Sequence, residues 1–516
     1  MKRRQFLQTG SLLSVPVMLG GMELSAVSRS SLFNFINMDD DRVLVLIQLN
    51  GGNDGLNMII PIDQYSGLSA VRPNLMLPES SVLKLTDKTG IHPAMDGLSK
   101  LYKEGMMAVV QSVGYPNQNR SHFRSTDIWM SASDAKEYES SGWVGRYFDG
   151  NHSTYPAGYP NNNFPDPLAI TISSFVSETC QGAVNNFSYA LTARTSVKLV
   201  EETIAGPSDN TCYSSEVDFV RTTIKQSNAY AANILSAFDK GKNVATYPSN
   251  NNLANQLKTV ANLIAGGLRT KIYVVSIGGF DTHANQVQIG EPTVGNHANL
   301  LKSISDAVSS FMADMKSLGY SEKVVGMTFS EFGRQIRSNN SLGTDHGTAA
   351  PLILFGSCVN ANVYGNNPQI TSSIAPQEGV PMQYDFRSVY ASLLIDWLGV
   401  PAAQVKTLLF KDFQKLPVIK NCSKPSSVEE DIIEIQANLA PNPCSDYIYV
   451  NFNNIGKHVH LSVYNAIGSQ LDIPINKTLH QGPHEVMIDT SGFQAGSYFV
   501  RLAVDNAVQT MKFVKI

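Results

Sequence analysis

Three sets of acidic and histidine residues lie beside strongly apolar, strand-like runs, far apart in the chain. Asp54 follows the first run, Asp281 and His283 follow another, and Asp345 and His346 lie between two further runs. In an open α/β sheet, ligands bind in the loops at the carboxyl ends of the strands. Carboxylates and imidazoles are also ligands of divalent metals. The pattern therefore predicts one metal site shared by the three sets.

A hydroxyl group flanked by arginines follows another apolar run. Ser121 opens a predicted helix, and Arg120 and Arg124 lie beside it. A serine at this position is commonly a helix cap. The same position offers backbone N–H groups to an oxyanion, so Ser121 is a candidate nucleophile once a metal or base activates it. The chain has no G-x-S-x-G motif, which argues against a serine hydrolase of the nucleophile-elbow type.

A further charged pair lies between the second and third sets. Glu331 is either a metal ligand or the partner that fixes the tautomer of a histidine. Arg334 has the planar guanidinium that suits an anionic substrate group, and a buried Glu331–Arg334 ion pair is the structural alternative.

The middle of the chain alternates between two hydrophobic patterns. Nearly continuous apolar runs predict buried strands at residues 43–49, 107–113, 168–172, 272–277, 324–329 and 352–355. Helical spacing of apolar residues predicts helices at residues 217–238, 253–268, 297–318 and 389–398. This alternation predicts an α/β fold, in which a mostly parallel sheet is sandwiched by helices.

Composition limits the kinds of partner and compartment. The 516 residues carry a formal net charge of −4 and no basic stripe, so we expect no nucleic-acid partner. The five cysteines have no zinc-ribbon spacing. If disulfides form, the pairs nearest in sequence are Cys180–Cys212 and Cys422–Cys444, although the sequence does not fix the pairing.

The amino-terminal residues have the layout of an export signal. A basic start precedes a short apolar stretch that is too weak to span a membrane. Arg3–Arg4 followed by Gln-Phe-Leu resembles the twin-arginine export motif, and an ordinary secretory signal is the alternative. We therefore expect a signal at residues 1–30 and no transmembrane span in the mature chain.

The character of the chain changes after residue 420. Residues 421–436 are polar and acidic, as in a linker, and residues 437–516 alternate between short strands and turns, which predicts a small all-β sandwich. This segment resembles the type A sorting domain of the type IX secretion system through PNP at 441–443, VYNAIG at 463–468, AGSYFVR at 495–501 and KFVK at 512–515. The resemblance implies an exported protein, at the cell surface or extracellular, that meets the type IX secretion machinery. A generic β-sandwich binding module is the alternative.

The motifs of residues 41–420 resemble a family in their order. NGGNDGLN, RSHFRSTDIW, GGFDTHANQ, SEFGR and GTDHG look like domain of unknown function 1501, which is similar to the alkaline-phosphatase-like superfamily. The resemblance implies metal ligands at Asp54, Asp281, His283, Asp345 and His346, and a nucleophile at Ser121. No histidine occurs between His346 and His458, where the superfamily usually supplies one, so either His92, His122 or His297 is a substitute or one metal is lost.

The expected function is that of a metal-dependent hydrolase acting on a phosphate or sulfate ester, with an anionic small molecule or glycan as substrate. Arg120, Arg124 and Arg334 are the candidate substrate-binding residues. The metal is zinc, manganese, magnesium or calcium. No Cys-x-Pro-x-Arg motif is present, so formylglycine sulfatase chemistry is not supported. The alternative is a non-catalytic surface binding or adhesion protein on a degenerate hydrolase fold.

Overall fold

The computed structural model describes residues 41–516, apart from residues 153, 198–211, 421, 423–436, 457, 466–469 and 505–506. The predicted export signal and nearly all of the predicted linker lie outside the described residues. The chain forms two compact units that divide after Cys422. No helix in the described part has the length and apolar character needed to cross a membrane.

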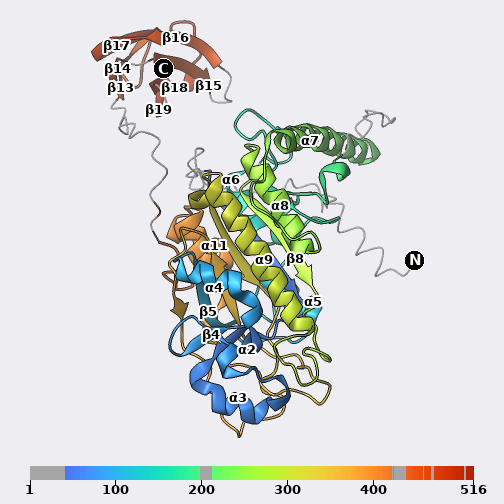
Figure 1. The fold of residues 1–516 in the computed structure, drawn as a ribbon. Helices are drawn as coiled ribbons and strands as arrows, with labels where there is room; N and C mark the ends of the chain where they lie inside the picture. Colours follow the sequence, from blue (N-terminus) through green and yellow to red (C-terminus); the bar gives the residue numbers. More distant parts are fainter. Residues whose placement is uncertain are drawn as a thin grey trace. The chain divides into compact units, whose positions relative to one another are not determined.

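The first unit, coloured from blue to orange in Figure 1, is built on a nine-stranded sheet with β1 (Val43–Asn50) near its centre. Its order is β11–β5–β10–β9–β1–β8–β6–β7, and β12 pairs with β5. The flanking strands are β5 (Met107–Gly114), β6 (Ala169–Thr171), β7 (Ser188–Ala190), β8 (Ile272–Gly278), β9 (Val324–Phe329), β10 (Ala350–Phe355), β11 (Val363–Tyr364) and β12 (Tyr384–Asp385). All pairings are parallel except those of β10 with β5 and β9.

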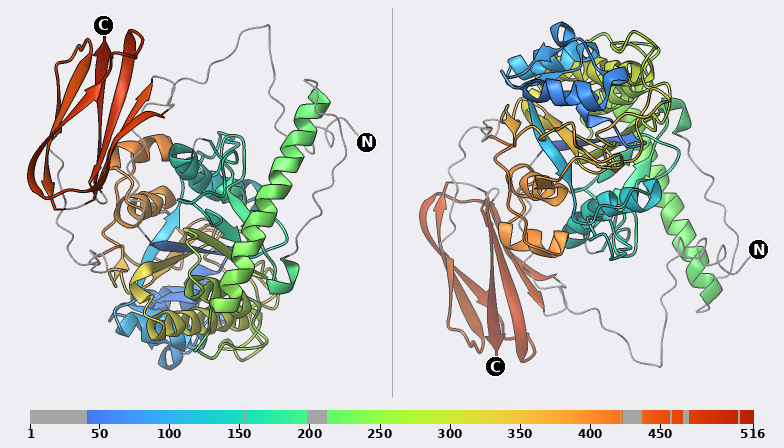
Figure 2. Two further views of the ribbon diagram at one scale, coloured as in Figure 1. Left: turned by 90° about the horizontal axis from the view of Figure 1, so that it is seen from above. Right: turned by 90° about the horizontal axis from the view of Figure 1, so that it is seen from below.

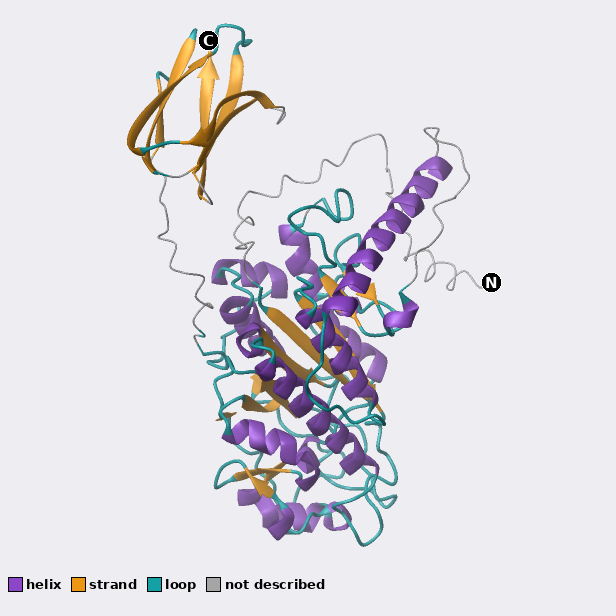
Figure 3. Ribbon diagram, turned by 45° about the horizontal axis from the view of Figure 1, so that its top comes forward, coloured by secondary structure: helices purple, strands orange, loops and turns teal. Residues whose placement is uncertain are grey.

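Helices cover both faces of this sheet, as the sequence predicts (Figure 3). In β1, Val45 and Ile47 belong to one apolar core while Leu44 and Leu46 belong to the other, so the strand is buried on both faces. The first core is shared with α4 (Asp96–Lys103), α7 (Cys212–Lys240), α8 (Asn252–Ala265) and α9 (Asn296–Ser317). The second is shared with α5 (His122–Ser131), α6 (Trp143–Asn151), α10 (Phe386–Ser392) and α11 (Ala402–Leu409).

The helices lie close to their predicted bounds. The carboxyl-terminal part of α7, the long green helix in Figure 2, contacts α8, and α8 contacts α9. The helix predicted at residues 389–398 begins earlier, at Phe386, because Asp385 caps it by accepting a hydrogen bond from the backbone N–H of Arg387 at 3.0 Å. Its last turn, Leu393–Trp397, is π-helical.

A small layer of short elements follows β1. It contains α2 (Gly55–Met58), α3 (Tyr65–Val71) and the three-stranded sheet of β2 (Ile59–Pro61), β4 (Thr89–Ile91) and β3 (Leu83–Lys84). Arg72 lies in this layer, directly after α3, and the side chain of Arg72 is fully buried.

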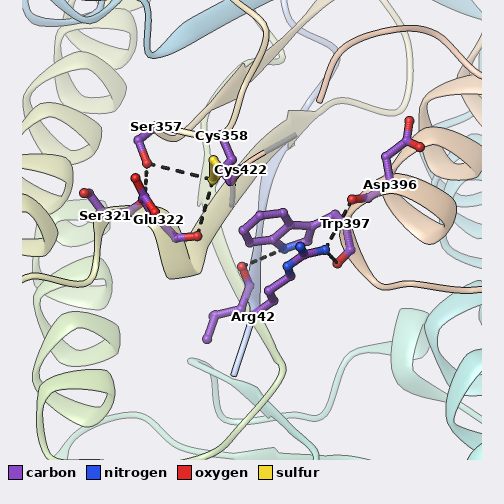
Figure 4. The surroundings of a disulfide bond; sticks show 9 residues. Arg42, Ser321, Glu322, Ser357, Cys358, Asp396, Trp397 and Cys422 are labelled. Atoms are coloured by element: carbon purple, nitrogen blue, oxygen red, sulfur yellow. Dashed lines mark hydrogen bonds between the residues drawn. A yellow bond between two sulfur atoms is a disulfide. The ribbon is translucent and has the colours of Figure 1, made fainter. Parts of the chain in front are cut away.

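The disulfide pairing differs from the expectation based on nearest neighbours. Cys358 is bonded to Cys422, whereas Cys180 and Cys444 are free thiols, so both predicted pairs are wrong (Figure 4). The tertiary fold brings the end of the first unit against the loop after β10, a contact that spacing in the sequence does not reveal. The bond ties the chain to the first unit just before the second unit begins.

The second unit consists of two antiparallel sheets, as predicted. One sheet has the order β13 (Ala437–Ala440), β14 (Tyr447–Ile455), β17 (Gln481–Asp489), and the other has β16 (Gln470–Thr478), β15 (His458–Asn465), β18 (Gly496–Val504), β19 (Ala507–Lys515). Inward side chains from both sheets form one core. Asn442 accepts a hydrogen bond from Val514 N–H at 2.9 Å, so two of the sorting motifs lie side by side.

Candidate metal centre

Four loops meet at one edge of the nine-stranded sheet. Because β1, β5, β8 and β9 are mutually parallel, their carboxyl ends share that edge. The loops after β1, β5, β8 and β9 therefore bring together residues that lie more than 200 positions apart in sequence. The loop after β9 runs to β10, whose opposite direction places the Asp345–His346 pair at the same edge.

Three imidazoles approach one carboxylate oxygen. The Nε2 atoms of His283 and His346 each lie 3.2 Å from Oδ1 of Asp281, and Nε2 of His122 lies 3.5 Å from it. The Nε2 atoms of His283 and His346 are 3.0 Å apart. His122, Asp281 and His346 form a group that could hold a metal ion, and it is the one such group found among the described residues.

The other ring nitrogen of each histidine has an acceptor of its own. Nδ1 of His122 lies 2.7 Å from Oε1 of Glu331, and Nδ1 of His283 lies 2.8 Å from Oδ1 of Asp345. Nδ1 of His346 lies 2.9 Å from the backbone oxygen of Arg120. A carboxylate or carbonyl oxygen only accepts, so each neutral imidazole carries its proton on Nδ1. All three Nε2 lone pairs then face the same point.

This arrangement fits a cation at the point where the lone pairs meet. Nε2 of His122 is buried and has no hydrogen-bond partner among the described residues. With all three imidazoles neutral, the Nε2 lone pairs and the carboxylate repel one another, and a cation or a shared proton between them removes that repulsion. Imidazoles held through Nδ1 by carboxylate or carbonyl oxygens are the usual arrangement of metal ligands.

The carboxylate at the centre is kept charged. Partial burial disfavours the ionised form of Asp281, but the hydrogen bond and charge of Arg334 outweigh burial and lower its pKa to about 2. The Nη2 atom of Arg334 lies 2.6 Å from Oδ1 of Asp281. Burial lowers the pKa of His346 below its usual value, although the Arg120 carbonyl and Asp281 act in the opposite direction. Both shifts favour the protonation states that bind a metal.

The loop after β1 approaches the centre through its backbone. Gly51 donates its N–H to Oε1 of Glu331 at 2.9 Å, the same atom that accepts from His122. The φ angle of Gly51 is 121°, and a Cβ there would lie 2.4 Å from the backbone nitrogen of Asp281. Only glycine permits this contact between the two loops.

Asp54 lies in a buried network and not in the group around Asp281. Its side chain is 1% exposed, and its two oxygens lie 3.0 and 2.9 Å from Nη1 of Arg72. Gln286 donates a further hydrogen bond to Oδ2 at 2.6 Å. Burial opposes the charge of Asp54, but Arg72, His297 and Gln286 lower its pKa below the usual value.

The three predicted substrate-binding arginines have different surroundings. Arg334 is buried and donates to the backbone oxygens of four residues as well as to Asp281. Arg124 is buried, pairs with Asp127 and stacks on Tyr138. The guanidinium of Arg120 is half-buried and has no hydrogen-bond or ion-pair partner in the described part of the chain. Of the three, Arg120 is the one available to an external anion.

Ser121 lies at the amino end of α5, directly before His122. It is exposed, and its hydroxyl does not cap the helix. No hydrogen bond joins that hydroxyl to a base among the described residues. Ser121 lies near the group around Asp281 because it is the residue before His122 in the sequence.

From the sequence, His122 received too little weight, and Asp345 was given the role of a direct metal ligand. His122 was one of three candidate substitutes for an expected histidine, yet its ring lies within the group around Asp281. Its position in RSHFR, one residue after the candidate nucleophile, was an available signal. The Oδ1 atom of Asp345, a predicted ligand, contacts Nδ1 of His283. That oxygen therefore faces the back of the imidazole and not the point where the Nε2 atoms meet. Gln286 ends the GGFDTHANQ motif without having been given a role, and Arg72 carried no recognisable signal.

The comparisons with known proteins identify two families in the chain. Residues 41–396, more than half of its length, match the family described as protein of unknown function (DUF1501), and the chain belongs to that family. Residues 438–516 match the secretion system C-terminal sorting domain. This sorting domain serves type IX secretion, which indicates export to the cell surface or the extracellular space.

A search of curated proteins found no relative of this chain. Among solved structures, an alkaline phosphatase superfamily protein from Vibrio parahaemolyticus is 11% identical, with 91% of this chain and 79% of that chain covered and a TM-score of 0.32. A sulfatase from Pseudoalteromonas is 11% identical (87% and 84% covered, TM-score 0.31). A type IX surface component of Porphyromonas gingivalis is 14% identical, but this chain spans 11% of its length, with a TM-score of 0.12. Similarities this low carry no argument about chemistry.

Proposed function

We propose that this protein is a metal-dependent hydrolase that cleaves a phosphate or sulfate ester outside the cell. The observation that carries the proposal is the convergence of three Nε2 lone pairs on the carboxylate of Asp281. The order of motifs that resembles the alkaline-phosphatase-like superfamily supports the reaction class. The sorting domain supports the location.

The proposed ligands are His122, Asp281, His283 and His346. Three imidazoles and one carboxylate suit zinc, whereas magnesium and calcium prefer ligand sets made of oxygen atoms. Glu331 and Asp345 hold two of the imidazoles from behind. A bound divalent ion supplies Lewis-acid polarisation of an ester oxygen at this point.

Arg120 and Ser121 provide the groups that bind and attack the ester. The guanidinium of Arg120 pairs with the anionic phosphate or sulfate oxygens, and the first N–H groups of α5 add favourable dipoles. The Ser121 oxygen attacks phosphorus or sulfur, the bond to the leaving alcohol breaks, and the alcohol takes up the hydroxyl proton. Water then cleaves the serine ester, which regenerates Ser121 and releases phosphate or sulfate.

The alternative is a surface protein that binds an anionic glycan without cleaving it. The absence of a base bonded to the Ser121 hydroxyl among the described residues favours this alternative. In that case the metal is structural or absent, Arg120 binds the anion, and no bond breaks.

Metal content and turnover of the full chain test the proposal. The purified protein is analysed for bound metals by mass spectrometry and assayed with phosphate monoesters, phosphate diesters and sulfate esters. We expect bound zinc and hydrolysis of at least one ester class, both lost in His283→Ala. The control is His458→Ala, which removes an exposed imidazole from the sorting domain. Bound metal without turnover would support the binding alternative, and absence of both metal and turnover would refute the hydrolase proposal.

A further inference from the structure

A buried chain of contacts joins Asp54 to the loops after β8 and after β9, which carry three of the four proposed metal ligands. Gln286 is fully buried and donates its side-chain N–H to Oδ2 of Asp54 at 2.6 Å. Its Oε1 accepts hydrogen bonds from the hydroxyls of Thr282, at 3.0 Å, and Thr344, at 2.9 Å. One amide group therefore touches the first carboxylate and two hydroxyls on separate loops.

The two threonines stand directly beside the proposed ligands. Thr282 lies between Asp281 and His283, and Thr344 precedes the Asp345–His346 pair. The loops also meet through their backbones, because the N–H of Thr344 donates to the oxygen of Thr282 at 3.1 Å. A movement of Gln286 would thus shift both loops.

Arg72 holds Asp54 in place and neutralises its charge. Its side chain is fully buried, and its Nη1 lies within 3.0 Å of both oxygens of Asp54. The remaining donors of Arg72 bind the backbone oxygens of Ile336 and Gln335 at 2.8 Å each. A divalent ion on Asp54 would have to lie beside this fixed guanidinium, and two buried positive charges with one carboxylate between them are strongly unfavourable.

We infer that Asp54, Arg72 and Gln286 form a positioning clamp for the two ligand loops, and that the centre holds one metal ion per chain. This inference rests on the metal centre proposed above. Asp54 is then a positioning residue whose carboxylate binds Gln286 and Arg72, and the guanidinium takes the place that a second cation would need.

The stoichiometry and affinity of zinc binding test the inference. The full chain is stripped of metal and titrated with Zn²⁺ against a chromophoric chelator, and Co²⁺ spectra report the ligand geometry. We expect one zinc per chain in the natural protein and in Asp54→Asn and Gln286→Met. Both variants should bind zinc more weakly, by up to about 10-fold, with altered Co²⁺ spectra, because they act through the threonines beside the ligands, whereas partners that touch the ligands themselves change affinity by about 10 to 100-fold.

The matched control is Asp314→Asn. Asp314 is another fully buried carboxylate of the same unit, and it accepts hydrogen bonds from Asn243, Tyr247 and the backbone N–H groups of residues 244 and 245. Its loss should lower stability without changing zinc affinity or the Co²⁺ spectrum. Should Asp54→Asn fail to fold, Thr344→Val removes a single hydroxyl contact to Gln286 and provides the same readout.

The outcomes are distinguishable. Two zinc ions in the natural protein and one in Asp54→Asn would make Asp54 a ligand and overturn the inference, while the proposed function would stand. Unchanged zinc affinity in Asp54→Asn, Gln286→Met and Thr344→Val would also overturn it. A natural protein that binds no zinc would instead refute the metal centre on which the inference rests.

Discussion

Glu331 lies behind His122, with its Oε1 atom 2.7 Å from Nδ1 of that ring. Glu331 is 3% exposed and also accepts the Gly51 N–H, so its carboxylate is held on both sides. The contact puts the proton of His122 on Nδ1 and directs Nε2 toward Asp281. Of the two roles considered for Glu331 from the sequence, metal ligand or partner of a histidine, this geometry favours the second.

Replacing Glu331 by Gln should therefore weaken metal binding without removing a ligand. The amide is similar in shape, but it has no charge and can turn its NH₂ group toward the ring. We expect zinc affinity to fall about 10 to 100-fold, which competition with a chelator measures. Glu378→Gln, at an exposed carboxylate, is the control. Equal zinc affinity in the natural protein and Glu331→Gln would contradict this role.

Arg120 and Arg334 should respond to alanine substitution in opposite ways. Arg120→Ala removes a guanidinium without internal partners, so stability should change by less than about 0.5 kcal/mol while KM for an anionic ester rises. Arg334→Ala leaves Asp281 and four backbone oxygens without their donor, so the free energy of unfolding should fall by roughly 3–5 kcal/mol. Urea unfolding and steady-state kinetics measure the two effects. A stable Arg334→Ala protein would show that these contacts contribute little.

Acid should destabilise the first unit through its buried histidines. Burial, with a smaller effect of the Lys271 charge, lowers the pKa of His152 from 6.5 to about 4. A lowered folded-state pKa means that the unfolded chain binds the proton first. The contribution of neutral His152 to the free energy of unfolding is therefore complete above pH 6.5 and is lost as pH falls toward 4. The slope from this residue approaches about 1.4 kcal/mol per pH unit.

The variant His152→Gln tests this prediction, because it keeps a polar group near Tyr159 but does not titrate. Unfolding free energies measured between pH 7 and pH 4 should show a shallower slope in the variant. His458→Gln, at an exposed position, should keep the natural slope. Parallel curves for the natural protein and His152→Gln would assign the acid sensitivity to other groups.

Reduction of the Cys358–Cys422 disulfide should destabilise the first unit. The bond closes a loop of 64 residues, for which the chain-entropy estimate is about 4 kcal/mol. The substitution Cys422→Ser and treatment of the natural protein with a reductant should lower the thermal midpoint to a similar extent, as measured by calorimetry. Cys444→Ser, at a buried free thiol of the second unit, keeps the Cys358–Cys422 bond, so reductant should lower its midpoint as in the natural protein, whereas Cys422→Ser should not respond to reductant. An unchanged midpoint after reduction would speak against a stabilising role.

The sequence by itself determined six strands of the large sheet, the helices α5 and α7 to α10, and the order of the two units. Six apolar runs became β1, β5, β6, β8, β9 and β10, because burial on both faces of a parallel sheet requires a local and nearly continuous apolar pattern. The sorting domain was equally readable, since its motifs lie within one short segment.

Only the tertiary structure decided which polar groups meet. Asp54 pairs with Arg72 and Gln286, whereas His122 joins Asp281 across 159 positions of sequence. In the sequence, an aspartate that follows a strand gives the same pattern whether its carboxylate binds a metal ion or pairs with a buried arginine. The difference lies in which side chain arrives from another loop, and that depends on how the strands are ordered in the sheet. The tertiary fold also decides that Cys358 is bonded to Cys422 and that the cysteines nearest in sequence are not paired.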